Sequence, residues 1–268
     1  MKLDWSNRKL LIGVVHLLPL PGSPRFHGAF QPILDRAVAD ARAYEKGGAS
    51  AVIIENFGDA PFTAGSVAPE TIAAMARAGT MVRAAIKLPI GFNVLRNDAR
   101  AALGLAAACG ASFIRINVHS GAMLTDQGII QGQAYETLRV RSHLCPNTQI
   151  LADVHVKHAV PLGTETLQNS ARDAWERAQA DALIVSGFGT GLPPLASSVE
   201  TVRQSCPKAP LLIGSGFTAD NAPEYLPWIQ GAIVGSSLKR GGRLNNPVDP
   251  VRVKALVRTM RNPLVMNS

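Results

Sequence analysis

Three ionisable residues alternate with apolar ones in the segment ILADVHVKHA, residues 150–159. Side chains alternate between the two faces of a strand, so we expect Asp153, His155 and Lys157 to share one face. A carboxylate, an imidazole and an amine on one wall can exchange protons with a bound molecule. The segment therefore predicts general acid–base chemistry.

The segment FIRINVH, residues 113–119, repeats this pattern, with Arg115, Asn117 and His119 on one face. By the same alternation, His16, Glu55 and Asn93 at the ends of three earlier apolar runs point to the same side of the sheet as Arg115 and Asp153. An ion pair of Arg115 with Asp153 or Glu55 would instead be structural, and a histidine at a strand end can be a hydrogen-bonded core residue. The candidate catalytic residues are His16, Glu55, Asn93, Arg115, Asn117, Asp153, His155 and Lys157.

Eight short runs rich in Val, Ile and Leu predict the strands that position these residues. They span residues 9–17, 51–57, 89–95, 112–119, 149–157, 182–188, 210–217 and 231–238. Between them, apolar residues at three- and four-residue spacing predict amphipathic helices. These cover approximately residues 32–46, 69–86, 98–109, 131–144, 165–179, 194–205, 219–229 and 249–261.

Eight strand and helix alternations without a break in composition predict one domain, residues 1–268, folded as an α/β protein. The count of eight favours a closed (β/α)₈ TIM barrel. An open Rossmann-like sheet is the alternative, and the absence of GxGxxG after the first run disfavours it. In a barrel, polar inward side chains gather at the mouth formed by the carboxyl ends of the strands.

Small residues follow the last two predicted strands, in LIGSGFTADN and IVGSSLKRGG. In TIM barrels the loops after strands seven and eight commonly bind phosphate, because glycine lets backbone N–H groups approach the anion. Either glycine pattern alone could simply mark a tight turn. The predicted phosphate-binding residues are Gly214, Ser215, Gly216, Gly235, Ser236 and Ser237.

Two further kinds of chemistry fit the same residues. His16, Glu55, Asp153 and His155 are candidate ligands for a divalent metal, although no HxH or HExxH spacing supports a metal site. Lys157 could form a Schiff base as in an aldolase, but a neighbouring Asp153 would favour its charged form.

The chain carries 27 Lys and Arg against 19 Asp and Glu, a net charge of +8. These basic residues are scattered, which predicts an anionic small molecule rather than nucleic acid as the ligand. Three cysteines without CxxC spacing predict a reducing compartment, the cytoplasm. The longest apolar run, LLIGVVHLLPLP, is too short to span a bilayer, so we expect neither a membrane segment nor an export signal. Association into a homo-oligomer stays open.

The chain contains the long and distinctive motifs GVVHLLPLPGSP, IENFGDAPF, FNVLRNDA, FIRINVHSGAMLTDQGIIQG, ILADVHVKHA, SGFGTG and GSGFTADN. Together these motifs resemble the BtpA/SgcQ family. The resemblance implies a TIM-barrel fold akin to phosphate-binding barrels. The family is named for a role in photosystem I biogenesis, while many members occur near sugar-uptake and sugar-metabolism genes. It implies no catalytic residue.

Two functions are therefore expected. In the first, an enzyme of isomerase, lyase or hydrolase type acts on a sugar phosphate or nucleotide-like metabolite. His155 or Lys157 would be its acid or base, and Arg115 with Asn117 would stabilise a developing oxyanion. In the second, the protein is a non-catalytic assembly or regulatory factor, which would need an exposed apolar surface.

Overall fold

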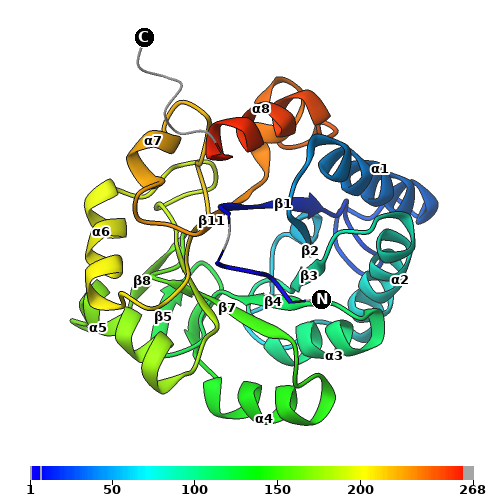
Figure 1. The fold of residues 1–268 in the computed structure, drawn as a ribbon. Coiled ribbons are helices and arrows are strands. Elements are labelled where there is room, and N and C mark those ends of the chain that lie inside the picture. Colours follow the sequence, from blue (N-terminus) through cyan, green and yellow to red (C-terminus); the bar gives the residue numbers. More distant parts are fainter. Residues whose placement is uncertain (1, 7, 262–268) are drawn as a thin grey trace.

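The computed structural model describes residues 2–6 and 8–261, and it has a closed barrel of eight parallel strands surrounded by helices (Figure 1). The order around the barrel is β1-β2-β3-β4-β7-β9-β10-β11, with β11 pairing back onto β1. The strands are β1 (Leu10–His16), β2 (Ala51–Glu55), β3 (Ile90–Asn93), β4 (Phe113–Ile116), β7 (Gln149–Val154), β9 (Ala182–Val185), β10 (Leu211–Ile213) and β11 (Gly231–Val234). The predicted (β/α)₈ fold is confirmed. Residues 1, 7 and 262–268 of the predicted domain lie outside the described residues.

Helices cover the outside of the barrel in chain order (Figure 1). They are α1 (Gln31–Gly47), α2 (Pro69–Ala85), α3 (Ala99–Cys109), α4 (Ala134–Leu144), α5 (Leu167–Arg172), α6 (Ala196–Ser205), α7 (Ala222–Tyr225) and α8 (Pro250–Arg261). A π-helical turn, Asp173–Arg177, extends α5. No helix among the described residues is both long and apolar enough to cross a membrane.

Strand parity divides the core into two layers. Outward side chains of the strands pack against the helices in the larger cluster, while alternate residues form a smaller cluster inside the barrel. On β1, for example, Leu10, Ile12 and Val14 belong to the inner cluster, and His16 comes next at the mouth. Apolar residues thus fill the lower barrel and polar residues close its upper end.

The N-terminal segment lies across the opposite end of the barrel (Figure 1). The backbone N–H of Leu3 donates to Oε1 of Gln149 at 2.7 Å. Leu3 is buried in the inner cluster, and Trp5 packs against it. This segment therefore closes the bottom of the barrel.

An additional antiparallel sheet, β6-β5-β8, lies outside the barrel. Its strands are β5 (Ala122–Thr125), β6 (Gly128–Gln131) and β8 (Ala159–Pro161). Met123 and Ile130 on its inner face pack with Val118 and Val156. The long segment after the fourth predicted strand is therefore a hairpin. The fifth predicted strand, residues 149–157, is shorter than expected, since β7 ends at Val154.

Candidate functional site

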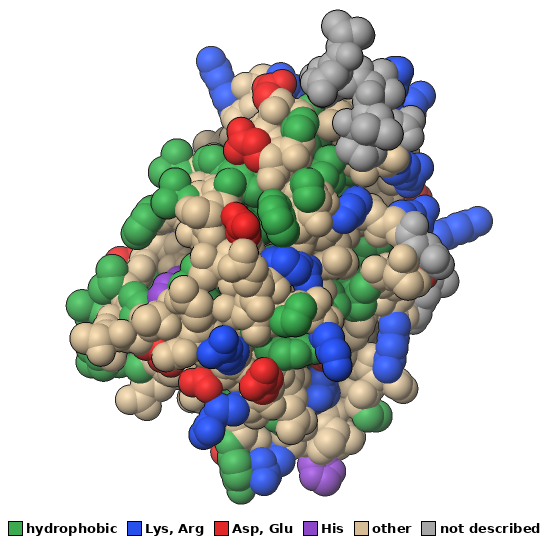
Figure 2. Space-filling model, turned by 60° about the vertical axis from the view of Figure 1, so that its left-hand side comes forward, with side chains coloured by type: hydrophobic (Ala, Val, Ile, Leu, Met, Phe, Trp, Pro, Cys, Tyr) green, Lys and Arg blue, Asp and Glu red, His purple; other side chains and the backbone are tan. Residues whose placement is uncertain are grey.

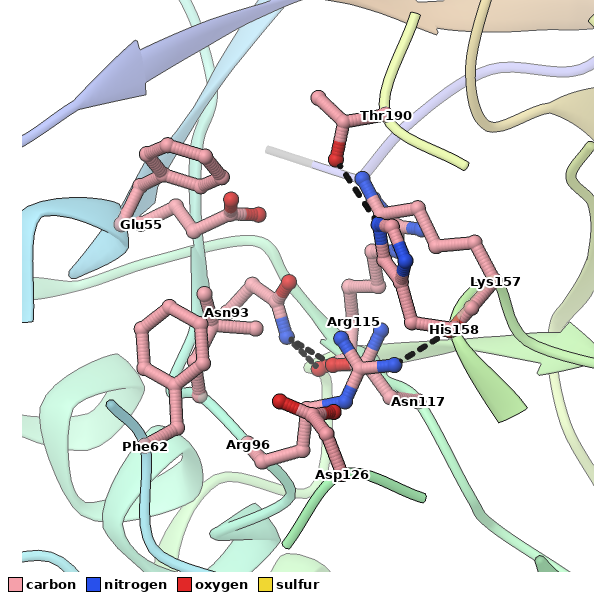
Figure 3. Close-up of a pocket in the computed structure, with 12 residues that line it drawn as sticks. Glu55, Phe62, Asn93, Arg96, Arg115, Asn117, Asp126, Lys157, His158 and Thr190 are labelled. Atoms are coloured by element: carbon pink, nitrogen blue, oxygen red, sulfur yellow. Dashed lines mark hydrogen bonds between the residues drawn. The ribbon is translucent and has the colours of Figure 1, made fainter. Parts of the chain in front are cut away.

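A polar cavity of about 350 Å³ opens at the mouth of the barrel, over β2, β3, β4 and the segment after β7 (Figure 3). Strand register sets part of its wall, because Glu55 pairs with His16 on one side and with Asn93 on the other. The residues that line the cavity are Glu55, Phe57, Phe62, Asn93, Leu95, Arg96, Arg115, Asn117, Asp126, Lys157, His158 and Thr190.

A hydrogen-bond network fixes the floor of this polar cavity. The Arg115 guanidinium donates to both carboxylate oxygens of Asp153, with Nη2 at 3.0 and 3.1 Å. Asn117 Nδ2 donates to Asp153 Oδ2 at 2.7 Å, and Asn93 Nδ2 donates to Asn117 Oδ1 at 3.0 Å. The structural ion pair considered from the sequence is thus formed, and the bonds to Asp153 fix the position of the Arg115 guanidinium below the cavity.

Glu55 differs from Asp153 in having no fixed partner. Its side chain is buried beside the cavity, yet its carboxylate makes no hydrogen bond or ion pair with another described residue. Figure 3 shows Glu55 and Lys157 reaching the cavity from opposite sides. A carboxylate near Arg115 and Lys157 but bonded to neither is available to accept a proton from a bound molecule.

Lys157 lies in an environment that disfavours its charge. Burial lowers the pKa of this amine below its ordinary value, and Arg115 lowers it further, while Glu55 and Asp153 act in the opposite direction. Arg96 holds the segment by donating to the backbone carbonyl of Lys157. Asp153 thus favours the charged form of Lys157, as expected from the sequence, but burial and Arg115 outweigh it and the net shift of the Lys157 pKa is downward.

Two predicted inward histidines point elsewhere. His155 has φ of 52°, which ends the strand alternation, and its Nε2 bonds with Ser170 Oγ at 3.0 Å in α5. His119 follows the end of β4, and its Nε2 bonds with the carbonyl oxygen of Ala178 at 2.9 Å. Neither residue lines the polar cavity. The expected placement of His155 as the mouth acid or base is therefore a wrong prediction.

A second, narrow cavity of about 60 Å³ adjoins the first above β9, β10 and β11. We name it the cradle. Its walls combine small residues with four of the predicted polar residues, His16, Glu55, Arg115 and Lys157. All six predicted phosphate-binding residues line it: Gly214, Ser215, Gly216, Gly235, Ser236 and Ser237.

Close packing explains the glycine at position 214. A Cβ there would lie 2.4 Å from Ser186 Oγ and 3.3 Å from Arg115 Nη2. Beyond it, Ser215 Oγ accepts from the N–H of Gly191 at 3.0 Å, which ties two loops of the cradle together. Neither Ser215 nor Gly216 donates its backbone N–H to another described residue. Such N–H groups can bind an anion.

The four candidate metal ligands do not converge. His155 bonds with Ser170, and Asp153 is fully engaged by Arg115 and Asn117, so only His16 and Glu55 remain beside the cradle. Among the described residues, no group of three or more His, Cys, Asp or Glu side chains could hold a metal ion.

Loops supply site residues that strand parity missed. Arg96 follows β3, and Asp126 lies in the hairpin between β5 and β6. His158 lies next to Lys157, and its Nε2 bonds with Thr190 Oγ1 at 3.2 Å (Figure 3). The glycine-rich segment SGFGTG, which overlaps the end of the sixth predicted strand, was the available signal for Thr190 and Gly191.

The fold and the mouth together define a (β/α)₈ barrel with polar side chains on one side of its mouth and a glycine- and serine-lined cradle on the other. The chain belongs to the BtpA family, whose model matches residues 7–262. It is 45% identical over 260 residues to the photosystem I biogenesis protein BtpA of Synechocystis, covering 97% of this chain and 91% of that protein. An uncharacterized protein of Caenorhabditis elegans is 33% identical, with 96% and 95% covered.

Solved structures with the same fold are far more distant in sequence. A thiamine phosphate pyrophosphorylase from Pyrococcus furiosus superposes with a TM-score of 0.58 at 16% identity, covering 94% of this chain and 95% of that one. A phosphoribosyl anthranilate isomerase from Thermococcus kodakaraensis gives 0.57 at 13% identity, with 95% and 99% covered. At these identities the likeness extends to the fold alone.

Proposed function

We propose that this protein is an enzyme that binds a phosphorylated small metabolite in the cradle and transforms it with Glu55 and Lys157. The observation that carries the proposal is the adjacency of two unlike surfaces. Glu55, Arg115 and Lys157 line both the polar cavity and the cradle, so a molecule held by its phosphate can present its neighbouring atoms to all three.

Each group has a distinct role in this proposal. Backbone N–H groups around Ser215 and Gly216 bind the phosphate, with the fixed Arg115 guanidinium nearby. Glu55 takes a proton from the substrate, and Lys157 as an ammonium gives one to a developing oxyanion, as an isomerase or lyase requires. In its neutral form, which burial favours, Lys157 could instead attack a carbonyl carbon and form a Schiff base with loss of water.

The similar structures support a phosphorylated substrate indirectly. The Pyrococcus and Thermococcus proteins are named for a thiamine phosphate and for a phosphoribosyl compound, and they share the barrel fold with this chain. The six cradle residues were selected from the sequence alone, by the positions at which such barrels bind phosphate. Their gathering around one cavity is independent support for the proposal.

A second candidate function is that of an assembly factor, which the name of the Synechocystis relative suggests. The observation that favours it is an apolar row on the outer face of the additional sheet. Leu124 pairs with Ile129 on β6 and with Val160 on β8, and the three are 47%, 53% and 53% exposed. Figure 2 shows hydrophobic side chains gathered along one edge of the molecule, whereas Lys and Arg are scattered.

Thermal unfolding with added ligands tests the enzyme proposal. Inorganic phosphate and ribose 5-phosphate should raise the Tm, because a ligand at about a hundred times its Kd adds roughly 2.7 kcal/mol to the folded state. Lys157→Met and Glu55→Gln should fold normally and bind inorganic phosphate, but lose turnover of the substrate. A panel of sugar phosphates and nucleotides that leaves the Tm unchanged would refute the proposal.

The matched control is Leu124→Ser on the additional sheet. It should leave phosphate binding intact, since Leu124 lines neither the polar cavity nor the cradle. If Leu124→Ser abolishes the biological role while Lys157→Met does not, the assembly function replaces the enzyme proposal.

A further inference from the structure

A third cavity of about 720 Å³ lies beside the cradle, between the loops that follow β1, β2 and β11. It is about twice as large as the polar cavity. Most of its wall is apolar, and two aromatic rings, Phe26 and Phe57, belong to it. The other apolar residues that line it are Leu17, Leu18, Pro19, Ala29, Pro32, Ile33, Ala60 and Leu244.

Fixed cations form one part of this apolar cavity. Arg36 and Lys239 line it, and both are held by the buried Asp40, with Arg36 Nε at 3.0 Å and Lys239 Nζ at 3.6 Å from Oδ2. Asp40 itself does not line the cavity, and no carboxylate is among the described residues that do. The cavity therefore suits an uncharged or anionic group with a large apolar surface and disfavours a cationic one.

His16 connects this apolar cavity to the cradle. His16 and Leu244 line both spaces. A Cβ at position 235 would lie 2.5 Å from His16 Cε1, so Gly235 lets the imidazole lie against the cradle wall. The His16 and Phe57 rings pack edge to face, with centroids 5.1 Å apart. The buried Nδ1 of His16 has no hydrogen-bond partner among the described residues.

The environment of His16 favours the uncharged imidazole. Burial lowers its pKa well below the ordinary value, and Lys239, Lys157, Arg36 and Arg115 lower it further. The imidazole is therefore neutral near pH 7 and can both donate and accept a hydrogen bond at the junction of the two spaces.

We propose that the apolar cavity binds a flat ring carried by the same ligand whose phosphate occupies the cradle. The ligand class is then an organic phosphate with an aromatic or heteroaromatic group, such as a nucleoside 5′-phosphate, rather than a small sugar phosphate alone. A small sugar phosphate has no apolar surface with which to cover Phe26, Phe57 and Leu244. This inference rests on the proposed phosphate site and names the kind of molecule that fills it.

Isothermal titration with paired ligands tests the inference. Ribose 5-phosphate, adenosine 5′-monophosphate and uridine 5′-monophosphate share a phosphate and a ribose but differ in the ring. We expect at least one nucleotide to bind at least roughly tenfold more tightly than ribose 5-phosphate, from the apolar area that the ring buries.

Ala29→Trp should fill the apolar cavity, because Ala29 is exposed on its wall. In that variant the nucleotide advantage, meaning the tighter binding of the nucleotide than of ribose 5-phosphate, should disappear. The Kd of ribose 5-phosphate should stay unchanged, which also shows that the cradle is folded. Leu18→Trp, from the same wall, provides a second test should Ala29→Trp not fold. The control Ala196→Trp places the same bulk at an exposed position of α6 outside the cavity and should keep the advantage.

The outcomes separate the two proposals. Nucleotides that bind no more tightly than ribose 5-phosphate, or an advantage that survives both cavity-filling variants, overturn the ring site and leave the phosphate site in place. If neither inorganic phosphate nor ribose 5-phosphate nor a nucleotide binds, the phosphate proposal itself fails and the ring site with it.

Discussion

The two sides of the barrel mouth are built in opposite ways. Over β3, β4 and β7, long polar side chains hold one another in place, with Asp153 bonded to both Arg115 and Asn117. Over β10 and β11, the wall consists of glycine and serine, and neither Ser215 nor Gly216 donates its N–H to another described residue. Glu55 and Lys157 face both sides.

The two sides of the mouth are therefore held in shape by different interactions. The side over β3, β4 and β7, the network side, depends on charge, because each buried ion there is tolerated only with its partner present. The cradle side depends on space, because a single added methyl group collides with its neighbours. Substitutions should therefore damage the first side through electrostatics and the second through packing.

The largest expected effect is on the network side. Asp153→Ala leaves the Arg115 guanidinium buried without its carboxylate, which should lower the free energy of unfolding by about 3–5 kcal/mol. Urea unfolding measures the loss. The double variant Arg115→Met, Asp153→Ala removes the unpaired charge and should recover a large part of it. A loss below about 1 kcal/mol for Asp153→Ala would show that the network is not what holds this side together.

The next effect concerns the cradle. In Gly214→Ala the new Cβ would lie 2.4 Å from Ser186 Oγ and 2.6 Å from Ile184 Cγ2, so the wall must shift. We expect the free energy of unfolding to fall by roughly 1–3 kcal/mol and phosphate binding to weaken. Gly65→Ala is the control, since a Cβ there meets nothing within 4 Å. Equal effects of the two substitutions would argue against steric control of the cradle.

A smaller effect follows from the lowered pKa of His16. Between its ordinary pKa of 6.5 and its lower folded-state pKa, the unfolded chain binds a proton that the folded protein does not, so stability falls as pH falls through this window. When the pH falls from 7.5 to 5.5, the free energy of unfolding of His16→Gln should decrease by roughly 1 kcal/mol less than that of the wild type. Urea unfolding at the two pH values checks this. The other histidines are common to both proteins, so identical pH profiles would contradict the assignment.

The smallest effect is expected outside both sides of the mouth. Leu124→Ser removes an exposed side chain from the outer face of the additional sheet, so the free energy of unfolding should stay within about 0.5 kcal/mol of the wild-type value. The same urea titration measures it. A larger loss would mean that the apolar row is covered in solution, for example by a second copy of the chain.

Strand periodicity predicted the regular part of the site well. Within β2, β3 and β4, and one residue beyond β4, alternation placed Glu55, Asn93, Arg115 and Asn117 at the mouth, and the structure places them there. This works because hydrogen-bonded neighbours fix both the register and the direction of each side chain in a barrel. The position of the glycine and serine runs after the last two strands, at the same mouth, was predicted from the sequence as well.

The same reasoning fails where the strands end. Beyond Val154 the positive φ of His155 turns the chain, so His155 points to α5, and Lys157 reaches the cavity from a loop rather than from a strand. Arg96 and Thr190 also come from loops, whose side-chain directions depend on long-range packing that alternation does not encode.

The N-terminal segment, which closes the bottom of the barrel, determines from which end the mouth can be reached. Leu3 and Trp5 close the lower end, so any molecule that reaches the polar cavity or the cradle must come from the upper end. The barrel is thus closed at one end, and the loops after β1, β2 and β11 lie at its open end.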